Sequence, residues 1–510
     1  MTGRFDLLDL AVLLAYLSGT TALGMWIGRG QRTASEYFVA ERSIPWWAGL
    51  FSIVASETSA LTFISIPGLA YTGNLGFLQV VAGYIIGRFV VAYTLLPRYF
   101  QGNLVTAYAL LETRFGLGTR RFTSIVFMFT RAMADAVRVF ATAIPVSLII
   151  GPVLPKAYAM PASILVLGLL TVVYTYRGGM KAVVWTELLQ ASIYLLGGLS
   201  AIVLIGQSID GGWTTIIAKA GASGKLQAID WYTGFDRPHT MFAGVIGGAF
   251  LAMASHGADQ IIVQRLLSSR SLKEAQRAII GSGFAVFAQM ALFLMVGVGL
   301  WVLYEGRAFS AADQIFPSYI IERMPHGLIG LIVAAIIAAT MSTHSGAINA
   351  LAASATHDIY LPFTGRSPDD PRTLKVGKFF ALMWGIVLTA GALLFKEQGT
   401  PVVVIALSIA SFTQGGLLGG FFLGLFWQRA IQRDAILGMT VGISCMAFIV
   451  FAKQIVAAYP SMAQTLGGVA TIAWPWYVLI GLSITFVTGM LSSFTHAAPT
   501  ALRTTSESHA

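Results

Sequence analysis

Long apolar segments recur along the whole chain and are separated by short polar loops. A helix needs roughly 20 apolar residues to cross a hydrocarbon core about 30 Å thick. The segments of this length run approximately 7–28, 45–72, 76–99, 122–151, 157–176, 182–206, 240–265, 278–304, 326–356, 376–396, 401–427, 435–453 and 473–494. The pattern predicts an all-α polytopic membrane protein with about 13 transmembrane helices.

Composition agrees with this pattern. The chain is 56% hydrophobic and only 11% charged, whereas ordinary soluble domains carry about 25% charged residues. Lipid is therefore expected to solvate most of the surface. The net charge of +10 does not predict a nucleic-acid partner, because the basic residues follow the apolar segments instead of gathering in one cluster.

The loops alternate between rich and poor in Lys and Arg. The rich set contains Arg29, Arg32, Arg42; Arg98, Arg114, Arg120, Arg121; Arg177, Lys181; Arg265, Arg270, Lys273, Arg277; Arg366, Arg372, Lys375, Lys378; Arg429, Arg433; and Arg503. Since basic loops stay in the cytoplasm, the alternation predicts a multi-pass protein of the cytoplasmic (inner) membrane. Its N-terminus is expected outside and its C-terminus inside.

The second apolar segment contains an unusual polar run. Ser56, Glu57, Thr58 and Ser59 lie between apolar flanks, and Pro67 follows. Such side chains offer the backbone competing hydrogen bonds, and proline removes a donor. Charged groups at mid-membrane cost about 2.5–3.5 kcal/mol each and tend to mark functional sites. The run predicts an unwound helix whose main-chain oxygens face a cation.

Hydroxyl groups on the ninth segment supply further oxygen atoms. Ser342 and Thr343 are expected to complete an oxygen shell for a hard cation such as sodium. A simpler interpretation is that each hydroxyl bonds back to the carbonyl four residues earlier. His344 is either a packed, hydrogen-bonded residue or part of a proton relay.

Five further polar positions have structural alternatives. Arg88 lies near the cytoplasmic end of its segment and is expected to snorkel to the interface. Asp259 and Gln260 are at least as well explained by a cap or loop clamp as by a site. Asp135 and Arg138 share a helix face, so Arg138 either neutralises Asp135 or binds substrate.

Five separated motifs follow one another in the order of a known family. They are Ser59-Ala60 to Pro67-Gly68; 178–187 (GGMKAVVWTE); 264–271 (QRLLSSRS) with 274–277 (EAQR); 342–349 with 358–360 (DIY); and Ser411-Phe412 through Gly420-Phe421. On these motifs the chain resembles the sodium:solute symporter family. That family includes sodium/galactose, sodium/proline, sodium/iodide and sodium/sialic acid symporters.

The resemblance implies two inverted repeats of five helices, each opening with a broken helix. Residues 1–43 would then be an additional helix and loop, 44–206 the first repeat and 240–427 the second. Residues 207–239 would form an external loop with a small cap, and 428–510 two additional helices and a cytoplasmic tail. The second helix and the seventh, interrupted by Gly244, Gly247 and Gly248, are expected to be discontinuous.

The resemblance also places the principal sodium site. Matched by position, its ligands are main-chain oxygens of the broken helix and of the ninth helix, together with two hydroxyls. The matching residues are Ala55, Thr58, Ala339, Ser342 and Thr343. Thr343 stands where serine is usual and keeps the hydroxyl.

A second cation site is implied near an acidic residue of the Trp-Thr-Asp motif of the family. Here that position is Glu187, one methylene longer than aspartate. Its carboxylate is expected to bind a second sodium or to carry a proton, so one or two sodium ions would move in each cycle.

The substrate pocket departs from the galactose pattern. The sugar contacts of that branch fall on Thr62, Val81, Ala252 and Ser255, which do not reproduce them. The predicted substrate-binding residues are Ser59, Thr62, Gln79, Arg138, Ser255 and Gln414. Arg138 matches an arginine that grips a substrate carboxylate in the sialic acid branch, a pairing that suits guanidinium geometry.

Together these features predict sodium-coupled symport of a small organic solute, such as an organic or sugar acid, by alternating access. The alternatives are proton coupling through Glu187 or His344, and a neutral sugar, polyol or amino acid as solute. A channel is disfavoured by the pair of broken helices. A membrane enzyme is disfavoured because the sequence offers no convincing His/Cys/Asp constellation.

Overall fold

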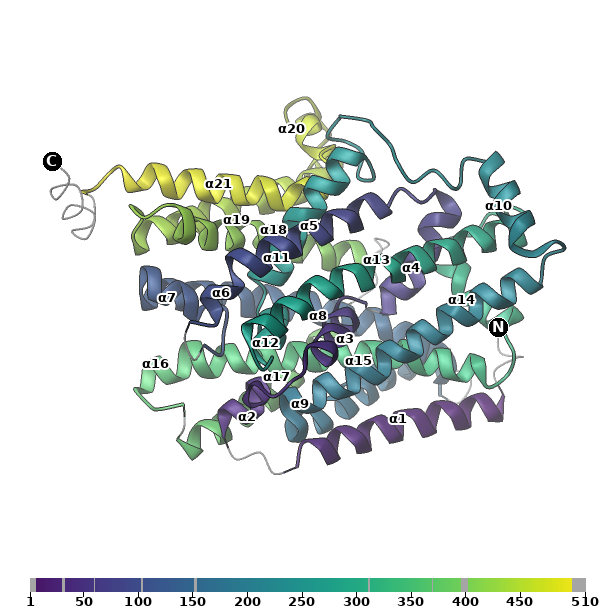
Figure 1. Cartoon of the computed structure of the whole chain (residues 1–510), viewed down its shortest axis with the longest axis horizontal. Coiled ribbons are helices and arrows are strands. Elements are labelled where there is room, and N and C mark those ends of the chain that lie inside the picture. Colours follow the sequence, from purple (N-terminus) through teal and green to yellow (C-terminus); the bar gives the residue numbers. More distant parts are fainter. Residues whose placement is uncertain are drawn as a thin grey trace.

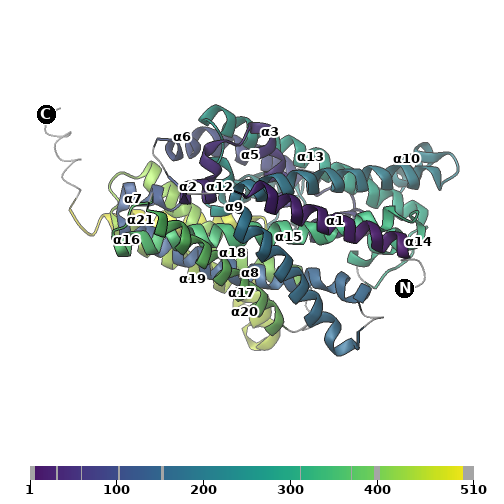
Figure 2. The ribbon, with the colours of Figure 1, turned by 90° about the horizontal axis from the view of Figure 1, so that it is seen from below.

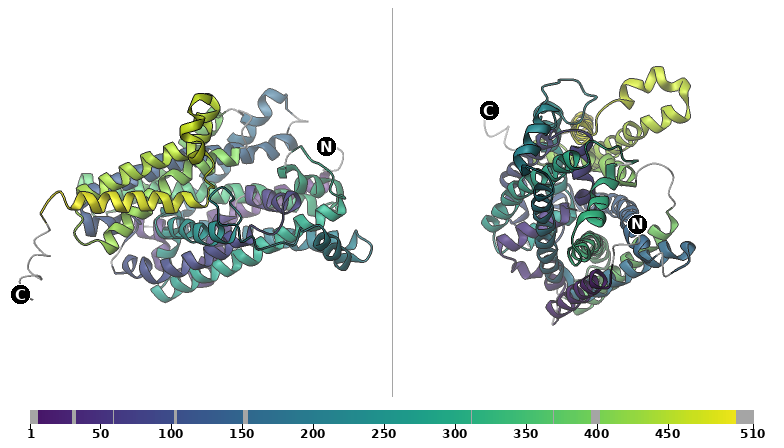
Figure 3. Two further views of the ribbon diagram at one scale, coloured as in Figure 1. Left: turned by 90° about the horizontal axis from the view of Figure 1, so that it is seen from above. Right: turned by 90° about the vertical axis from the view of Figure 1, so that its right-hand side faces the viewer.

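The computed structural model describes residues 6–29, 33–58, 60–101, 104–150, 154–310, 312–368, 370–395 and 402–497. Within these ranges the chain is almost entirely helical, with one isolated bridge between Ile44 and Ser269. The long helices lie side by side along a common direction (Figure 1). Viewed along that direction, most of them appear end-on (Figure 3).

The long helices form most of the bundle. They are α1 (Leu7–Ile27), α5 (Leu78–Thr94), α8 (Leu117–Ile150), α9 (Lys156–Gln207), α13 (Leu272–Leu303), α15 (Leu328–Ser354), α17 (Pro371–Leu394), α18 (Val402–Phe426), α19 (Gln432–Ala458) and α21 (Trp476–Ser493). The start of α1 and the end of α21 lie at opposite ends of the bundle (Figure 1). This arrangement requires an odd number of crossings if both ends face water.

The second predicted segment is broken, as expected. It folds as α3 (Trp46–Glu57) and α4 (Ala60–Thr72). Between them Thr58 has φ −85° and ψ 83°, which is not helical. Ser59, a predicted substrate residue, lies outside the described residues.

The seventh predicted segment is also discontinuous, but not at its glycines. A π-helical turn at Ala243–Gly247 continues directly into α11 (Gly248–Gly257), and the break lies at Ala258, before α12 (Gln260–Leu267). Gly248 serves close packing instead: a Cβ there would lie 2.3 Å from the carbonyl oxygen of Val80 on α5. The expected location of the break was therefore wrong.

The fifth and sixth predicted segments run together as α9. Gly179 lies inside it with φ 54° and ψ −160°, a conformation essentially restricted to glycine. The residue kinks the helix and separates its two apolar halves.

Short helices lie at the ends of the bundle. They are α2 (Ala34–Val39), α6 (Leu96–Tyr99), α7 (Ala109–Phe115), α10 (Gly212–Ala222), α14 (Ile315–Arg323), α16 (Leu361–Thr364) and α20 (Ala463–Ala470), with single turns at Ala40–Arg42, Ala312–Gln314, Ala355–Tyr360 and Pro460–Met462. Helix α10 forms the small cap expected in the 207–239 loop. It lies at the same end of the bundle as the start of α1 (Figure 2).

Seven helices among the described residues are long and apolar enough to cross a membrane as single elements. The predicted segments outside this set are the two broken helices, the charged α8, and shorter apolar stretches such as Leu78–Thr94. The chain is thus a multi-helix membrane protein, and the thirteen crossings remain a prediction.

Candidate functional site

The first helix break lies among buried polar groups. The N–H of Thr58 still bonds to the carbonyl of Val54 at 2.9 Å, which closes the last turn of α3. Thr58 is fully buried. Its hydroxyl accepts a 2.9 Å hydrogen bond from the side-chain amide of Gln289 on α13.

Glu187 on α9 brings three helices together. Its carboxylate is fully buried. It accepts hydrogen bonds from Ser342 on α15 at 2.9 Å, from Ser56 on α3 at 3.3 Å and from Ser52 one turn earlier. Ser342 therefore faces the last two turns of α3. The sodium prediction depends on this proximity of α15 to α3.

Arg265 is the ionic partner of Glu187. It belongs to α12, is 1% exposed, and donates from Nη2 to Glu187 Oε1 at 2.5 Å and from Nε to Oε2 at 3.2 Å. Its Nη1 donates to the carbonyl of Ile261 at 2.7 Å. Arg265 was expected in a cytoplasmic loop, and this expectation was wrong because a buried carboxylate requires a buried counter-charge. The sequence feature that could have revealed Arg265 as internal is Glu187, because a carboxylate within an apolar segment needs a positively charged partner.

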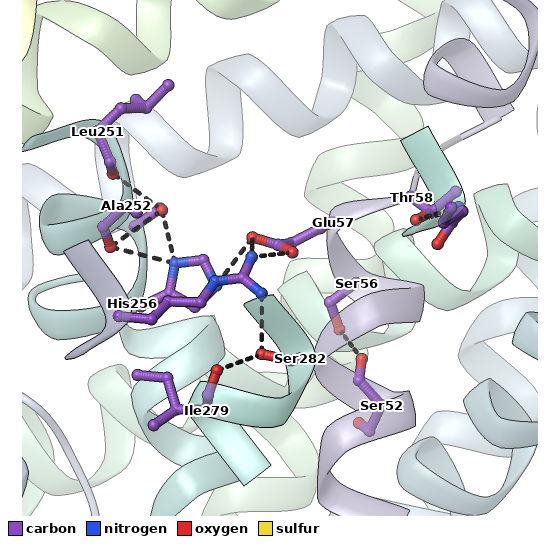
Figure 4. Close-up of polar contacts among 12 residues, drawn as sticks. Ser52, Ser56, Glu57, Thr58, Leu251, Ala252, His256, Ile279 and Ser282 are labelled. Atoms are coloured by element: carbon purple, nitrogen blue, oxygen red, sulfur yellow. Dashed lines mark hydrogen bonds and ion pairs between the residues drawn. The ribbon is translucent and has the colours of Figure 1, made fainter. Parts of the chain in front are cut away.

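The expectation that Arg88 snorkels to the interface was also wrong. It is fully buried and donates from Nη2 to Glu57 Oε1 at 2.5 Å and from Nη1 to Ser282 at 2.9 Å. His256 Nε2 lies 2.8 Å from the same Glu57 oxygen. Figure 4 shows Glu57, His256 and Ser282 turned toward one another from three helices. Arg88 does not snorkel, because Glu57 at the end of α3 holds it inside.

A charged row on α8 forms the candidate substrate region. Arg138 Nη1 lies 3.2 Å from Asp135, as the pairing interpretation expected. Asp135 is shared, however, because Arg131 also pairs with it. Arg131 Nη1 lies 3.8 Å from Asp259. Arg131 was missed by the sequence analysis, although its spacing of one and two turns from Asp135 and Arg138 on one face was visible.

A small cavity adjoins this charged row. Its polar lining consists of Thr130, Arg131, Asp259, Thr413 and Gln414, and its volume is about 30 Å³. That volume suits a few water molecules. An organic solute would need the helices around it to move apart.

The remaining predicted substrate residues make other contacts. The Gln79 amide donates to His239 O at 2.9 Å and accepts from the N–H of Asp230 at 3.1 Å, which fixes the loop 207–239 to α5. Ser255 donates to the Leu251 carbonyl at 2.9 Å, within its own helix. Thr62 is half-buried on α4. Their binding roles stay predictions.

The polar groups at the second break have structural tasks. Asp259 accepts from the N–H of Ile261 at 2.8 Å and caps α12. The Gln260 amide accepts from the N–H of Ala107 at 2.7 Å and donates to Val105 O at 3.1 Å. Both the cap and the loop clamp are confirmed.

The other predicted residues lie on α15. Thr343 and His344 are 9% and 3% exposed, and Ala339 precedes Thr343 by about one turn. Neither ring nitrogen of His344 has a hydrogen-bond partner among the described residues. His344 is packed as expected but lacks the expected hydrogen bond.

Comparison with known proteins identifies relatives with transport functions. The chain is 30% identical over 454 residues to the sodium/sialic acid symporter NanT of Aliivibrio fischeri, covering 87% of this chain and 88% of that protein. It is 29% identical over 454 residues to the sodium/sialic acid symporter SiaT of Proteus mirabilis, covering 86% and 88%.

A solved structure matches the fold over nearly its whole length. It is a Na⁺-coupled sialic acid symporter in a substrate-bound, outward-open state, with a TM-score of 0.82 and 27% identity, covering 97% of this chain and 99% of that one. The model of the sodium:solute symporter family matches residues 37–442. The chain therefore belongs to the sodium:solute symporter family and couples the transport of a solute across the membrane to sodium.

Proposed function

We propose that this symporter takes up a small organic acid, such as a sugar acid, together with sodium held between the first helix break and α15. The observation that carries the proposal is the hydrogen bond from Ser342 to Glu187, whose carboxylate also binds Ser52 and Ser56 on α3. It puts the α15 hydroxyl against the turns that precede the break.

The proposed sodium ligands are main-chain oxygens of Ala55, Thr58 and Ala339 and the hydroxyls of Ser342 and Thr343. Unwound backbone in a transporter helix frees carbonyl oxygens for such an ion. The non-helical torsions of Thr58 and the burial of both hydroxyl residues support this set. The site needs no sulfur or nitrogen ligand, as a hard cation prefers.

Glu187 bears on the number of coupled cations. Arg265 balances its charge in this arrangement, so the proposal assigns one sodium to the principal site. A second cation or a proton at Glu187 would have to follow withdrawal of Arg265. Proton coupling through Glu187 is therefore the alternative that this ion pair disfavours.

The stoichiometry determines how far an anion accumulates. A membrane potential of about 100 mV contributes roughly 2.3 kcal/mol per inward charge, and a tenfold sodium gradient contributes about 1.4 kcal/mol. For a monoanion moving with one sodium the electrical contributions cancel, which leaves about tenfold accumulation. Accumulation well above this value would require a second cation.

Arg138 is the proposed contact for the substrate carboxylate. Asp135 is shared between two arginines, so a substrate carboxylate can take over one guanidinium without leaving Asp135 unpaired. The sodium/sialic acid symporters among the relatives transport a carboxylated sugar, which supports the same solute class. Gln414 on the cavity wall and Thr62 on α4 are proposed as polar contacts.

We also propose thirteen crossings in the inner membrane, with two inverted repeats over 44–206 and 240–427. The alternation of basic loops supports an external N-terminus and a cytoplasmic C-terminus. The placement of α1 and α21 at opposite ends of the bundle is consistent with it.

Uptake by reconstituted protein tests the proposal. Proteoliposomes receive labelled sialic acid, lactate or galactose, with sodium and pH gradients imposed separately. We expect sodium-driven uptake of an acid and its loss in Arg138→Gln, while sodium binding persists. Uptake driven by a pH gradient alone, or of galactose alone, would overturn the proposal. Gln432→Glu, on a distant cytoplasmic helix start, is the control for an altered charge.

A further inference from the structure

Four helices meet in one charged cluster beside the first break. Glu57 ends α3, Arg88 comes from α5, His256 from α11 and Ser282 from α13. Both oxygens of Glu57 contact Nη2 of Arg88, one of them at 2.5 Å, and Arg88 Nη1 donates to Ser282 at 2.9 Å. The broken helices α3 and α11 are thereby tied to the unbroken helices that follow each break.

His256 is itself held in place. Its Nδ1 lies 3.1 Å from the carbonyl oxygen of Ala252 and 2.9 Å from the hydroxyl of Ser255, both on its own helix. Its Nε2 then meets Glu57 at 2.8 Å. The Glu57 carboxylate is therefore restrained from two sides, by Arg88 and by a ring that cannot easily turn.

A second restraint acts on the next residue. The side chain of Gln289, 3% exposed, donates to the Thr58 hydroxyl at 2.9 Å. In a continuous helix the hydrogen bond to residue i+4 fixes the direction of each carbonyl. At a break this restraint is lost, so contacts from neighbouring helices must set the direction of the main-chain oxygens.

We infer that Arg88 and Gln289 are positioning residues for the sodium site, acting through Glu57 and Thr58 respectively. The inference rests on the proposed location of that site. Neither side chain contacts the ion. Arg88 holds the last residue of α3 and Gln289 holds the first residue past it, so the main-chain oxygens of Ala55 and Thr58 keep a fixed spacing. His256 extends the restraint to the second broken helix.

Sodium binding to the purified full chain provides the test without a known solute. The measurement is the rise in unfolding temperature with added NaCl, relative to choline chloride. The sodium concentration that produces half of the maximal rise is the half-effect concentration, or sodium midpoint. The variants are Gln289→Leu, which removes the contact to Thr58, and Glu57→Gln with Arg88→Gln, which removes the ion pair without leaving a buried charge. We expect the half-effect concentration to rise about tenfold in each, the scale that loss of one buried hydrogen bond produces.

Two further variants separate positioning from general support. Arg88→Lys keeps the charge but not the fork that reaches Glu57 and Ser282 together, so an intermediate sodium midpoint is expected. Ser282→Ala removes only the outer contact of Arg88 and should leave the midpoint within about twofold. If the variants unfold at lower temperature but keep the wild-type sodium midpoint, the cluster is merely structural and the inference is overturned.

The ligand variant Ser342→Ala with Thr343→Ala distinguishes a failure of the positioning inference from a failure of the proposed sodium site. If it loses the sodium response while the Arg88 and Gln289 variants keep theirs, the inference fails and the proposed site stands. If none of the variants changes the sodium midpoint, the proposed site itself fails and the inference with it.

Discussion

The two broken helices are interrupted in physically different ways. At the second break the helix cap is local: Asp259 caps α12 through the N–H of Ile261 at 2.8 Å, and its own N–H bonds to Ala254 O at 3.1 Å, while Arg131 on α8 lies 3.8 Å from the same carboxylate. At the first break the flanking residues depend on other helices, since Glu57 is bound by Arg88 and Thr58 by Gln289. The second break is therefore capped by a residue of its own segment, whereas Glu57 and Thr58 at the first break are held by side chains of α5 and α13.

Buried ion pairs connect the two breaks. Glu57 and Glu187 both lie beside the first break, and each is matched by one buried arginine, Arg88 or Arg265. Arg265 belongs to α12, so the second broken helix supplies the counter-charge for Glu187, a residue of α9 that contacts α3 beside the first break. The breaks therefore differ in their local design but are connected electrostatically.

The largest expected effect is a loss of stability when the ion pair between Arg265 and Glu187 is broken. Arg265→Met leaves Glu187 buried without a counter-charge, a change that typically costs 3–5 kcal/mol. We expect a large fall in the unfolding temperature of the protein in detergent. Adding Glu187→Gln should restore much of the loss, because no unpaired charge then remains. A single variant as stable as the wild type would contradict the role of the pair.

The next effect concerns sodium at the first break. Ser342→Ala with Thr343→Ala removes two proposed oxygen ligands and should raise the sodium concentration for half-maximal uptake by about tenfold or more. The maximal rate at saturating sodium should change less. Ser345→Ala, whose hydroxyl bonds to the carbonyl of Ser342 at 2.9 Å, is the matched control on the same helix. An unchanged sodium midpoint would reject the site.

The smallest effect is expected at the second break. Asp259→Ala removes a helix cap, which is worth about 1 kcal/mol, and should leave the sodium midpoint unaltered. Asp370→Ala removes an equivalent cap, on the N–H of Arg372 at 2.8 Å, at the start of α17. The two variants should lose similar stability. A selective loss of sodium binding in Asp259→Ala would abolish the contrast between the breaks.

Sequence reasoning succeeded where the cause is local. The break beside Glu57 follows from polar residues competing for the backbone, and the cap at Asp259 follows from its side chain reaching two residues ahead. It failed where partners are remote. Arg88 and Arg265 each resemble a cytoplasmic-side charge in the linear pattern, and only their pairing with Glu57 and Glu187 shows them to be internal. Gly244 and Gly248 of the seventh segment resemble a break but serve close contact with α5.

The sequence by itself predicted a multi-helix membrane protein and the interruption of its second segment. These properties depend on apolar length and on neighbours within a few residues. Tertiary structure decided which charges neutralise one another and that Ser342 on α15 meets α3 at Glu187. Those contacts join positions 31, 78 and 155 residues apart, and their energy exists only once packed helices exclude water from the ion pairs.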